Sequence, residues 1–201
     1  MTQATRERIE FTDFLETLSA EQWDEPSLCA GWTVREVVTH VISYDELGWR
    51  RTAARLARAR FSLAGANAIG AADRSRTPSE LVALFRAHPR PRGLTAAFGG
   101  MIALLDGMIH QQDIRRALGL PREIPGDRLR TALRLALLAP PIGAFKRARG
   151  LTLVAPDLGW SRGRGPEVRG PGEALLMAIA GRRDAVGDLS GPGQPILATR
   201  L

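Results

Sequence analysis

Apolar residues recur at helical spacing through most of the first 150 residues, and this periodicity constrains the fold more than any other feature. Long helical segments joined by short connections are typical of an antiparallel bundle. The sequence therefore predicts a mostly α-helical chain built on an antiparallel four-helix bundle. The predicted helices cover residues 5–18, 33 to about 61, 77–88 and 101–118, and a fifth follows at residues 127–139.

Two of these helices begin with a strong local signal. Thr33 and Glu36 form a capping box, in which the hydroxyl and the carboxylate pair with amide groups that the first helical turn leaves without partners. Thr77 and Glu80 repeat the pattern, with Pro78 at the first helical position. Gly119 is placed to end the helix over residues 101–118 in the left-handed conformation.

The pattern changes after Gly150. Residues 151–156 (LTLVAP) predict a short strand, residues 166–170 (PEVRG) predict a second one, and residues 173–181 predict a short helix that Gly181 ends. We therefore expect two domains: a helical bundle at residues 1–148, which carries the candidate metal-binding residues described below, and a small α+β C-terminal domain at residues 149–201.

The net charge of +7 does not by itself indicate a nucleic-acid partner. The 28 basic residues are spread along the chain among 21 acidic ones, and no zinc-finger spacing or glycine-rich phosphate loop accompanies them. Lys146 is the only lysine, and this preference for arginine is typical of the GC-rich genomes of actinobacteria. We expect no binding to nucleic acid.

The chain contains one cysteine, Cys29, so no disulfide can form within it. No apolar run approaches the roughly 18–20 residues needed to span a bilayer, and the first residues lack the apolar core of a secretion signal. These features predict a cytoplasmic protein without a membrane contact, either a monomer or a homodimer. With no base near it in the sequence, Cys29 is expected to be a small buried loop residue, and a role as nucleophile is the less favoured alternative.

The candidate chemistry lies on two of the predicted helices. His40 flanks the apolar stripe of the helix that starts at Thr33. Asp106, His110 and Asp113 share one face of a later helix, because residues three and four apart are neighbours on a helix surface. Buried carboxylates need a partner or a cation, so His40, Asp106 and His110 are candidate ligands of a divalent metal with an open position.

Simpler explanations exist for each of these residues. A histidine at the edge of a helix can be an interior hydrogen-bonding group, and Asp113 can pair with Arg115 or Arg116 on the helix surface. His88 precedes Pro89 at a predicted helix end, where it would complement the helix dipole.

Three blocks of the sequence resemble the mycothiol-dependent maleylpyruvate isomerase family, one of the DinB-like metal-binding bundles. PSLCAGWTVREVVTHV (26–41) and LLDGMIHQQDIRRALG (104–119) are similar to its two signatures. The tail, LTLVAPDLGW through GPEVRGPGEALLMAIAGRR, is similar to its small C-terminal domain. The resemblance implies a DinB-like four-helix bundle followed by a small α+β domain.

By position, the resemblance makes His40, Asp106 and His110 the ligands of a zinc-like ion. Asp113 would then be an alternative ligand or the group that orients His110. In the namesake isomerase the acid is a glutamate, and Asp106 is shorter by one methylene, which bears on the coordination distance and the choice of metal.

The resemblance also implies the activity. The thiol of mycothiol would occupy the fourth position of the metal, and the metal-bound thiolate would attack a small electrophilic substrate, giving an isomerase or an S-transferase. Two alternatives remain: a metal-dependent hydrolase that uses bound water, and a non-enzymatic protein that binds a small molecule or a lipid.

Overall fold

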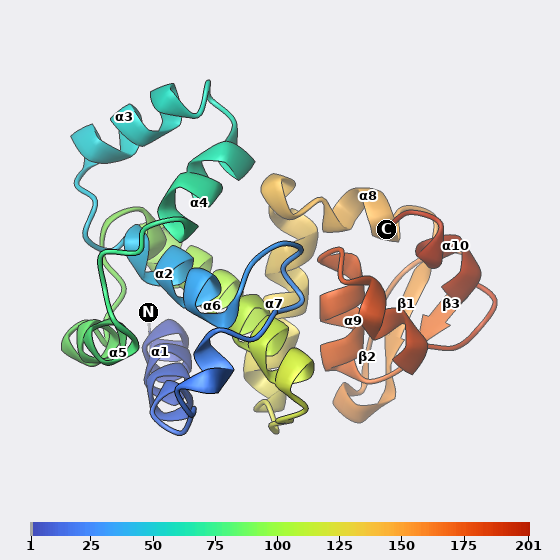
Figure 1. Ribbon diagram of the computed structural model, residues 1–201. Helices are drawn as coiled ribbons and strands as arrows, with labels where there is room; N and C mark the ends of the chain where they lie inside the picture. The colour runs from blue at the N-terminus through green and yellow to red at the C-terminus, as the bar shows by residue number, and fades with distance from the viewer. Residues whose placement is uncertain (1) are drawn as a thin grey trace. The chain divides into compact units, whose positions relative to one another are not determined.

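The computed structural model describes residues 2–201 and divides into two units, one ending at Pro121 and one covering Arg122–Leu201 (Figure 1). Helices make up most of both units, and the second also holds a small three-stranded sheet. The expectation of a mostly helical chain with a small α+β part near its C-terminus is therefore confirmed. The helices of the first unit are α1 (Thr2–Leu15), α2 (Val34–Ser43), α3 (Trp49–Arg58), α4 (Leu63–Ala71), α5 (Pro78–Ala87) and α6 (Ala97–Leu118).

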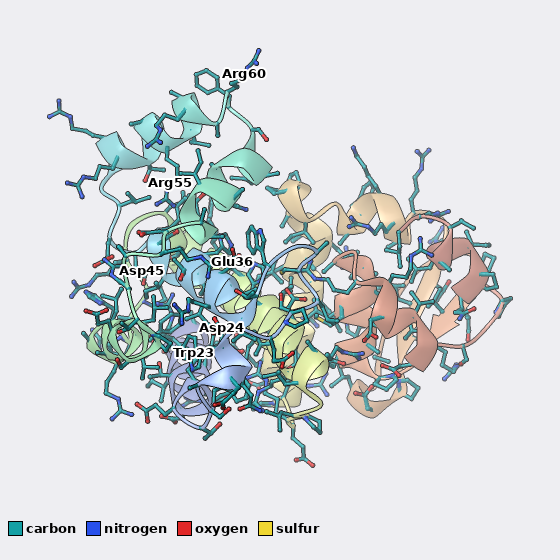
Figure 2. All side chains as sticks on the ribbon, in the orientation of Figure 1. Trp23, Asp24, Glu36, Asp45, Arg55 and Arg60 are labelled. Atoms are coloured by element: carbon teal, nitrogen blue, oxygen red, sulfur yellow. The ribbon has the colours of Figure 1, made fainter. Side chains whose placement is uncertain are left out.

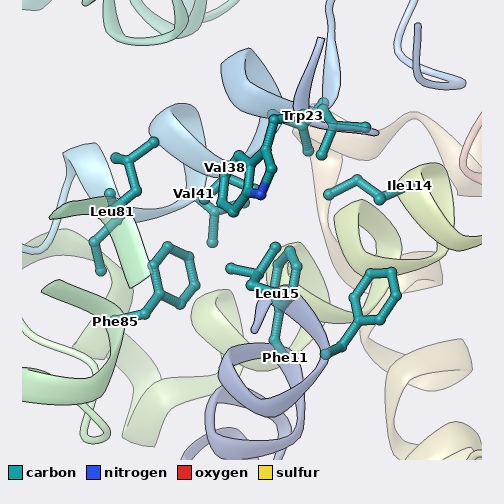
Figure 3. Packing of buried hydrophobic residues seen from close by; sticks show 12 residues of the cluster. Phe11, Leu15, Trp23, Val38, Val41, Leu81, Phe85 and Ile114 are labelled. Atoms are coloured by element: carbon teal, nitrogen blue, oxygen red, sulfur yellow. The ribbon is translucent and has the colours of Figure 1, made fainter. Parts of the chain in front are cut away.

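Four helices enclose the core of the first unit. α1 packs against α5 and α6, and α2 packs against the same two helices. Their apolar stripes meet in one cluster, in which Phe11 lies edge-on to Phe85 with the ring centroids 5.4 Å apart (Figure 3). These four helices correspond to the four that the apolar spacing predicted. The buried residues of the cluster are Phe11, Phe14, Leu15, Trp23, Val34, Val37, Val38, Val41, Ile42, Leu81, Phe85 and Ile114.

The predicted helix ends agree with the structure where a local signal marks them. Both capping boxes are formed, at Thr33 and at Thr77. Gly119 ends α6 with a φ of 67°. Phe98, Gly99 and Gly100 also have positive φ, so the regular part of α6 begins after Gly100, as predicted.

The expected single helix from residue 33 to about 61 is wrong. α2 ends at Ser43, the chain leaves the helix, and α3 starts at Trp49. The break brings Asp45 into the interior, where its carboxylate accepts hydrogen bonds from Arg8 Nη1 at 2.9 Å and Thr95 Oγ1 at 2.6 Å (Figure 2). Residues 63–71 then form α4, a helix that the sequence analysis did not anticipate.

The second unit contains α7 (Gly126–Leu138), α8 (Ala144–Ala148), α9 (Gly172–Ile179), α10 (Gln194–Ala198) and three strands. β1 (Thr152–Ala155) lies between β2 (Trp160–Gly163), which is antiparallel to it, and β3 (Glu167–Arg169), which is parallel. The predicted strands correspond to β1 and β3, and the predicted helix over residues 173–181 to α9. The turn after β2 requires glycine, because a Cβ on Gly163 would lie 2.1 Å from the Leu151 carbonyl oxygen.

The division after Pro121 differs from the domain boundary expected after residue 148. α7 belongs to the second unit because it packs against α9, in which every residue except Glu173 is buried. Gly126 and Gly172 both lie against the Leu158 side chain, which ties the two helices to the same turn.

One stretch, Gly93–Leu118, is long and apolar enough by length and composition to cross a membrane. A single such helix is weak evidence, because the core helix of a soluble protein meets the same criterion. The absence of a membrane contact therefore stays a prediction.

The buried ion pair between Arg8 and Asp45 gives a test of the break between α2 and α3. Asp45→Ala leaves the Arg8 guanidinium buried without a counter-charge, which is expected to lower the free energy of unfolding by about 3–5 kcal/mol. The control is Asp24→Ala, which removes a 69% exposed carboxylate 3.7 Å from Arg35 and should change the stability little. Urea unfolding followed by circular dichroism measures both, and equal losses would contradict a structural role for the pair.

Candidate metal centre

Two helices of the first unit bring His40, Asp106 and His110 together. The capping box at Thr33 starts α2, in which Glu36 accepts from the Thr33 amide at 2.7 Å, and His40 follows on the face turned toward α6. Asp106 and His110 lie one turn apart on α6. The rings of His40 and His110 are 4.9 Å apart between centroids and nearly perpendicular, at 83°.

The candidate ligand atoms of the three side chains lie close together. Asp106 Oδ1 lies 3.7 Å from His40 Nε2 and 3.4 Å from His110 Nε2. One nitrogen from each histidine and one carboxylate oxygen lie within 4.8 Å of one another. The structure thus brings together the three residues that helical spacing and the family resemblance singled out.

These distances can be compared with those expected for a hydrogen-bonded triad and for the ligands of one ion. A charge-assisted hydrogen bond between nitrogen and oxygen is about 2.7–2.9 Å long, so 3.4 and 3.7 Å are too long for good ones. Nitrogen and oxygen ligands lie about 2.0–2.1 Å from zinc, which places two ligands of a tetrahedral ion roughly 3.3–3.4 Å apart. The observed spacing therefore fits ligands of one shared ion.

Charge and burial are also consistent with a cation. The His40 and His110 side chains are only 3% and 12% exposed, whereas Asp106 is 30% exposed. Burial raises the pKa of Asp106, but the positive charges of the neighbouring His110 and His40 side chains outweigh this effect, so the pKa of Asp106 lies below its usual range. Burial lowers the pKa of His110, and the neighbouring Asp106 charge more than reverses this, which raises the pKa well above its usual value. The carboxylate is thus held in the charged form that binds metals.

Asp113 supports His110 from the side opposite Asp106. Its fully buried carboxylate accepts a hydrogen bond from His110 Nδ1 at 2.9 Å. A proton on Nδ1 leaves the lone pair of Nε2 directed toward Asp106, which is how metal-binding histidines are commonly oriented. Burial rules out the alternative that Asp113 lies on the helix surface. The equivalent nitrogen of His40, Nδ1, is buried and has no hydrogen-bond partner within residues 2–201.

Cys29 also contacts His110 and Asp113, and the sequence analysis did not anticipate this contact. Its thiol donates to Asp113 Oδ2 at 3.0 Å and lies 3.4 Å from His110 Nδ1. The expectation of a loop cysteine with no base nearby is therefore wrong. No local signal could have revealed the contact, because Cys29 and Asp113 are 84 positions apart in the chain.

Cys29, His110 and Asp113 form a second group of potential metal ligands. Their separations of 2.9–3.4 Å match hydrogen bonds through the protons of the thiol and of Nδ1. We interpret this group as support for His110. The third histidine, His88, lies at the end of α5, where its Nδ1 donates to the Leu84 carbonyl oxygen at 3.0 Å, consistent with the role expected at a helix end.

The thiol contact predicts an effect on stability that a matched pair of variants can measure. Cys29→Ala removes a donor to the buried Asp113 carboxylate and should lower the free energy of unfolding of the metal-free protein by about 1–3 kcal/mol. Cys29→Ser keeps a donor of similar size and should recover most of this loss. Urea unfolding of the two variants is the measurement, and equal stabilities would show that the hydrogen bond contributes nothing.

Comparison with known proteins shows relatives of this fold. The chain is similar to the solved structure of the mycothiol-dependent maleylpyruvate isomerase, with 16% sequence identity and a TM-score of 0.52 over 96% of this chain and 91% of that chain. A mutant of the mycothiol-dependent maleylpyruvate isomerase, with a histidine replaced by alanine, matches over the same shares at 15% identity and the same TM-score. No curated protein matches the chain. At such identities the likeness shows a common fold.

The evidence for the family comes from the sequence of the first unit. Residues 4–116, more than half of the chain, match the model of the mycothiol maleylpyruvate isomerase N-terminal domain. The matched segment includes His40, Asp106, His110 and Asp113. The chain therefore belongs to the mycothiol maleylpyruvate isomerase N-terminal domain family, as its resemblance predicted.

Proposed function

We propose that the chain is a metal-dependent enzyme that uses a small thiol to act on an electrophilic substrate, with His40, Asp106 and His110 as the metal ligands. The observation that carries the proposal is the separation of Asp106 Oδ1 from the Nε2 atoms of His40 and His110. These two distances are too long for good hydrogen bonds and suit ligands of a shared ion. Two imidazole nitrogens and one carboxylate oxygen form a donor set typical of catalytic zinc, so zinc is the metal we expect.

The residues of the chain would hold and tune the site. His40 and His110 would contribute nitrogen donors from buried positions, and Asp106 would contribute the negative charge. Because the pKa of His110 is raised in the metal-free protein, the metal would displace a proton from its Nε2 on binding. Asp113 keeps the proton of His110 on Nδ1, so that Nε2 remains available as a ligand. A divalent ion bound by three protein ligands supplies a Lewis acid that lowers the pKa of a thiol or a water in its remaining position.

We propose mycothiol as the thiol, and isomerisation or S-transfer as the reaction. Two findings support this proposal: the family to which the chain belongs and the likeness to a maleylpyruvate isomerase described as mycothiol-dependent. The two reactions share the attack of a thiolate on an electrophilic carbon, so the site serves either. Activation of water by the same site would give a hydrolase, which the second experiment below distinguishes.

The proposed ligands predict the metal content of variants. Purified without chelators, the protein should contain one equivalent of metal by elemental analysis, and His40→Ala and His110→Ala should contain almost none. His88→Ala is the matched control and should keep its metal. Asp113→Asn should keep the site but bind metal about 10–100-fold more weakly in a chelator competition. Full metal in the His40→Ala and His110→Ala proteins would refute the site.

The proposed cofactor predicts that turnover depends on the thiol. The metal-loaded protein should convert maleylpyruvate, or transfer mycothiol to another small electrophile, only when mycothiol is present. His110→Ala should lose this activity, and His88→Ala should retain it. Consumption of the electrophile at the same rate without any thiol would replace the proposal with the hydrolase.

A further inference from the structure

One stretch of the first unit carries positive charge only. Residues 47–72 contain five arginines and no aspartate or glutamate. They form α3, α4 and the turn between these helices, and α3 packs mainly against α4 (Figure 1). None of the α3 side chains that the structure describes is buried. α3 thus adds charge to the surface and no side chain to the core.

Most of this charge is not neutralised by the rest of the protein. Arg55 is directed inward and donates to Ser43 Oγ at 2.9 Å. Arg51, Arg58 and Arg60 are exposed, and none of them makes an ion pair with any residue of the range 2–201. These three guanidinium groups can therefore meet an anionic partner without breaking a contact within the fold.

The turn between α3 and α4 also exposes apolar side chains. Phe61 is 83% exposed and Leu63 is 42% exposed. Arg60 and Phe61 have φ angles of 54° and 61°, in the left-handed region that glycine occupies with less strain at a helix end. The Phe61 amide donates to the Leu56 carbonyl oxygen at 2.8 Å, and this contact, made by the backbone, does not require an aromatic side chain. Neither the helix end nor the core explains a phenylalanine at this position.

Charge and apolar surface meet at the end of this hairpin, which we call the α3–α4 tip: Arg58, Arg60, Phe61 and Leu63. Figure 2 shows Arg60 at the outer end of α3. A partner must accept both guanidinium groups and apolar side chains. The surface of a bilayer offers lipid phosphates beside the boundary of the acyl chains, where cations and apolar side chains bind together. Single-stranded nucleic acid would accept the arginines and stack on a phenylalanine, but it offers Leu63 no comparable contact.

We propose that the α3–α4 tip binds reversibly to the surface of a bilayer that contains anionic phospholipids. The arginines contact the headgroup phosphates, and Phe61 and Leu63 enter the boundary between headgroups and acyl chains. This contact is the opposite of the expectation from the sequence that the chain has no membrane contact. It is also independent of the proposed function, because no residue of the tip is a candidate metal ligand.

Flotation of the full chain with lipid vesicles tests the proposal. The wild type should bind vesicles made of equal parts phosphatidylglycerol and phosphatidylcholine, and the binding should weaken as salt is added. Vesicles of phosphatidylcholine alone should bind it weakly, because they lack the negative charge.

A matched pair of variants tests the apolar part of the tip. Phe61→Gly removes the ring and suits the left-handed backbone, so it should fold at least as stably as the wild type. It should bind the anionic vesicles about 10-fold more weakly. The control is Phe98→Gly, which should bind like the wild type. Phe98 is 78% exposed with a φ of 53°, and no charged residue lies between positions 93 and 105.

A second pair of variants tests the charged part. The double variant Arg58→Gln/Arg60→Gln should bind the anionic vesicles about 30-fold more weakly, as expected for two basic side chains near a membrane surface. Arg162→Gln/Arg164→Gln is the control, because it removes the same charge from exposed positions of the second unit. It should change the binding little.

Four results would overturn the proposal. The wild type could bind anionic vesicles no better than neutral ones, or Phe61→Gly could bind them as well as the wild type. The two arginine variants could weaken binding equally, which would reduce the effect to net charge. Tighter binding of a single-stranded oligothymidine than of the anionic vesicles in the same buffer would replace the membrane with nucleic acid.

Discussion

The buried carboxylate of Asp113 joins a loop, a helix and a candidate metal ligand. The Leu28 amide donates to the backbone carbonyl oxygen of Asp113 at 3.1 Å. The Cys29 thiol and His110 Nδ1 both donate to the side-chain Oδ2 of Asp113. A buried carboxylate needs such donors, because water is not present to replace a missing hydrogen bond and the folded state is then destabilised. The loop is therefore fixed against α6.

The fixed loop determines where α2 begins. A bridge between Pro26 and Thr33 closes the loop, and Thr33 is the residue that caps α2. His40 lies on α2, so its distance from Asp106 depends on the loop as well as on the packing of the two helices. Asp113 thus influences both histidines: it contacts His110 directly, and it affects His40 through the loop that precedes α2.

Local signals explain which parts of this structure could be predicted from the sequence. The capping boxes at Thr33 and Thr77 and the left-handed Gly119 act within a few residues, so the helix ends that they mark agree with the structure. The shared face of Asp106, His110 and Asp113 follows from helical geometry alone. The break after Ser43 and the contact of Cys29 depend on partners 37 and 84 positions away, which no spacing rule includes.

The break between α2 and α3 separates a buried helix from a mostly exposed one. After the end of α2, Asp45 pairs with Arg8 inside the core, and α3, which follows, is mostly exposed. None of the α3 side chains that the structure describes belongs to the packed cluster, and none is a candidate metal ligand. Exposed positions of α3 can therefore vary without disturbing the cluster that holds α2 against α6.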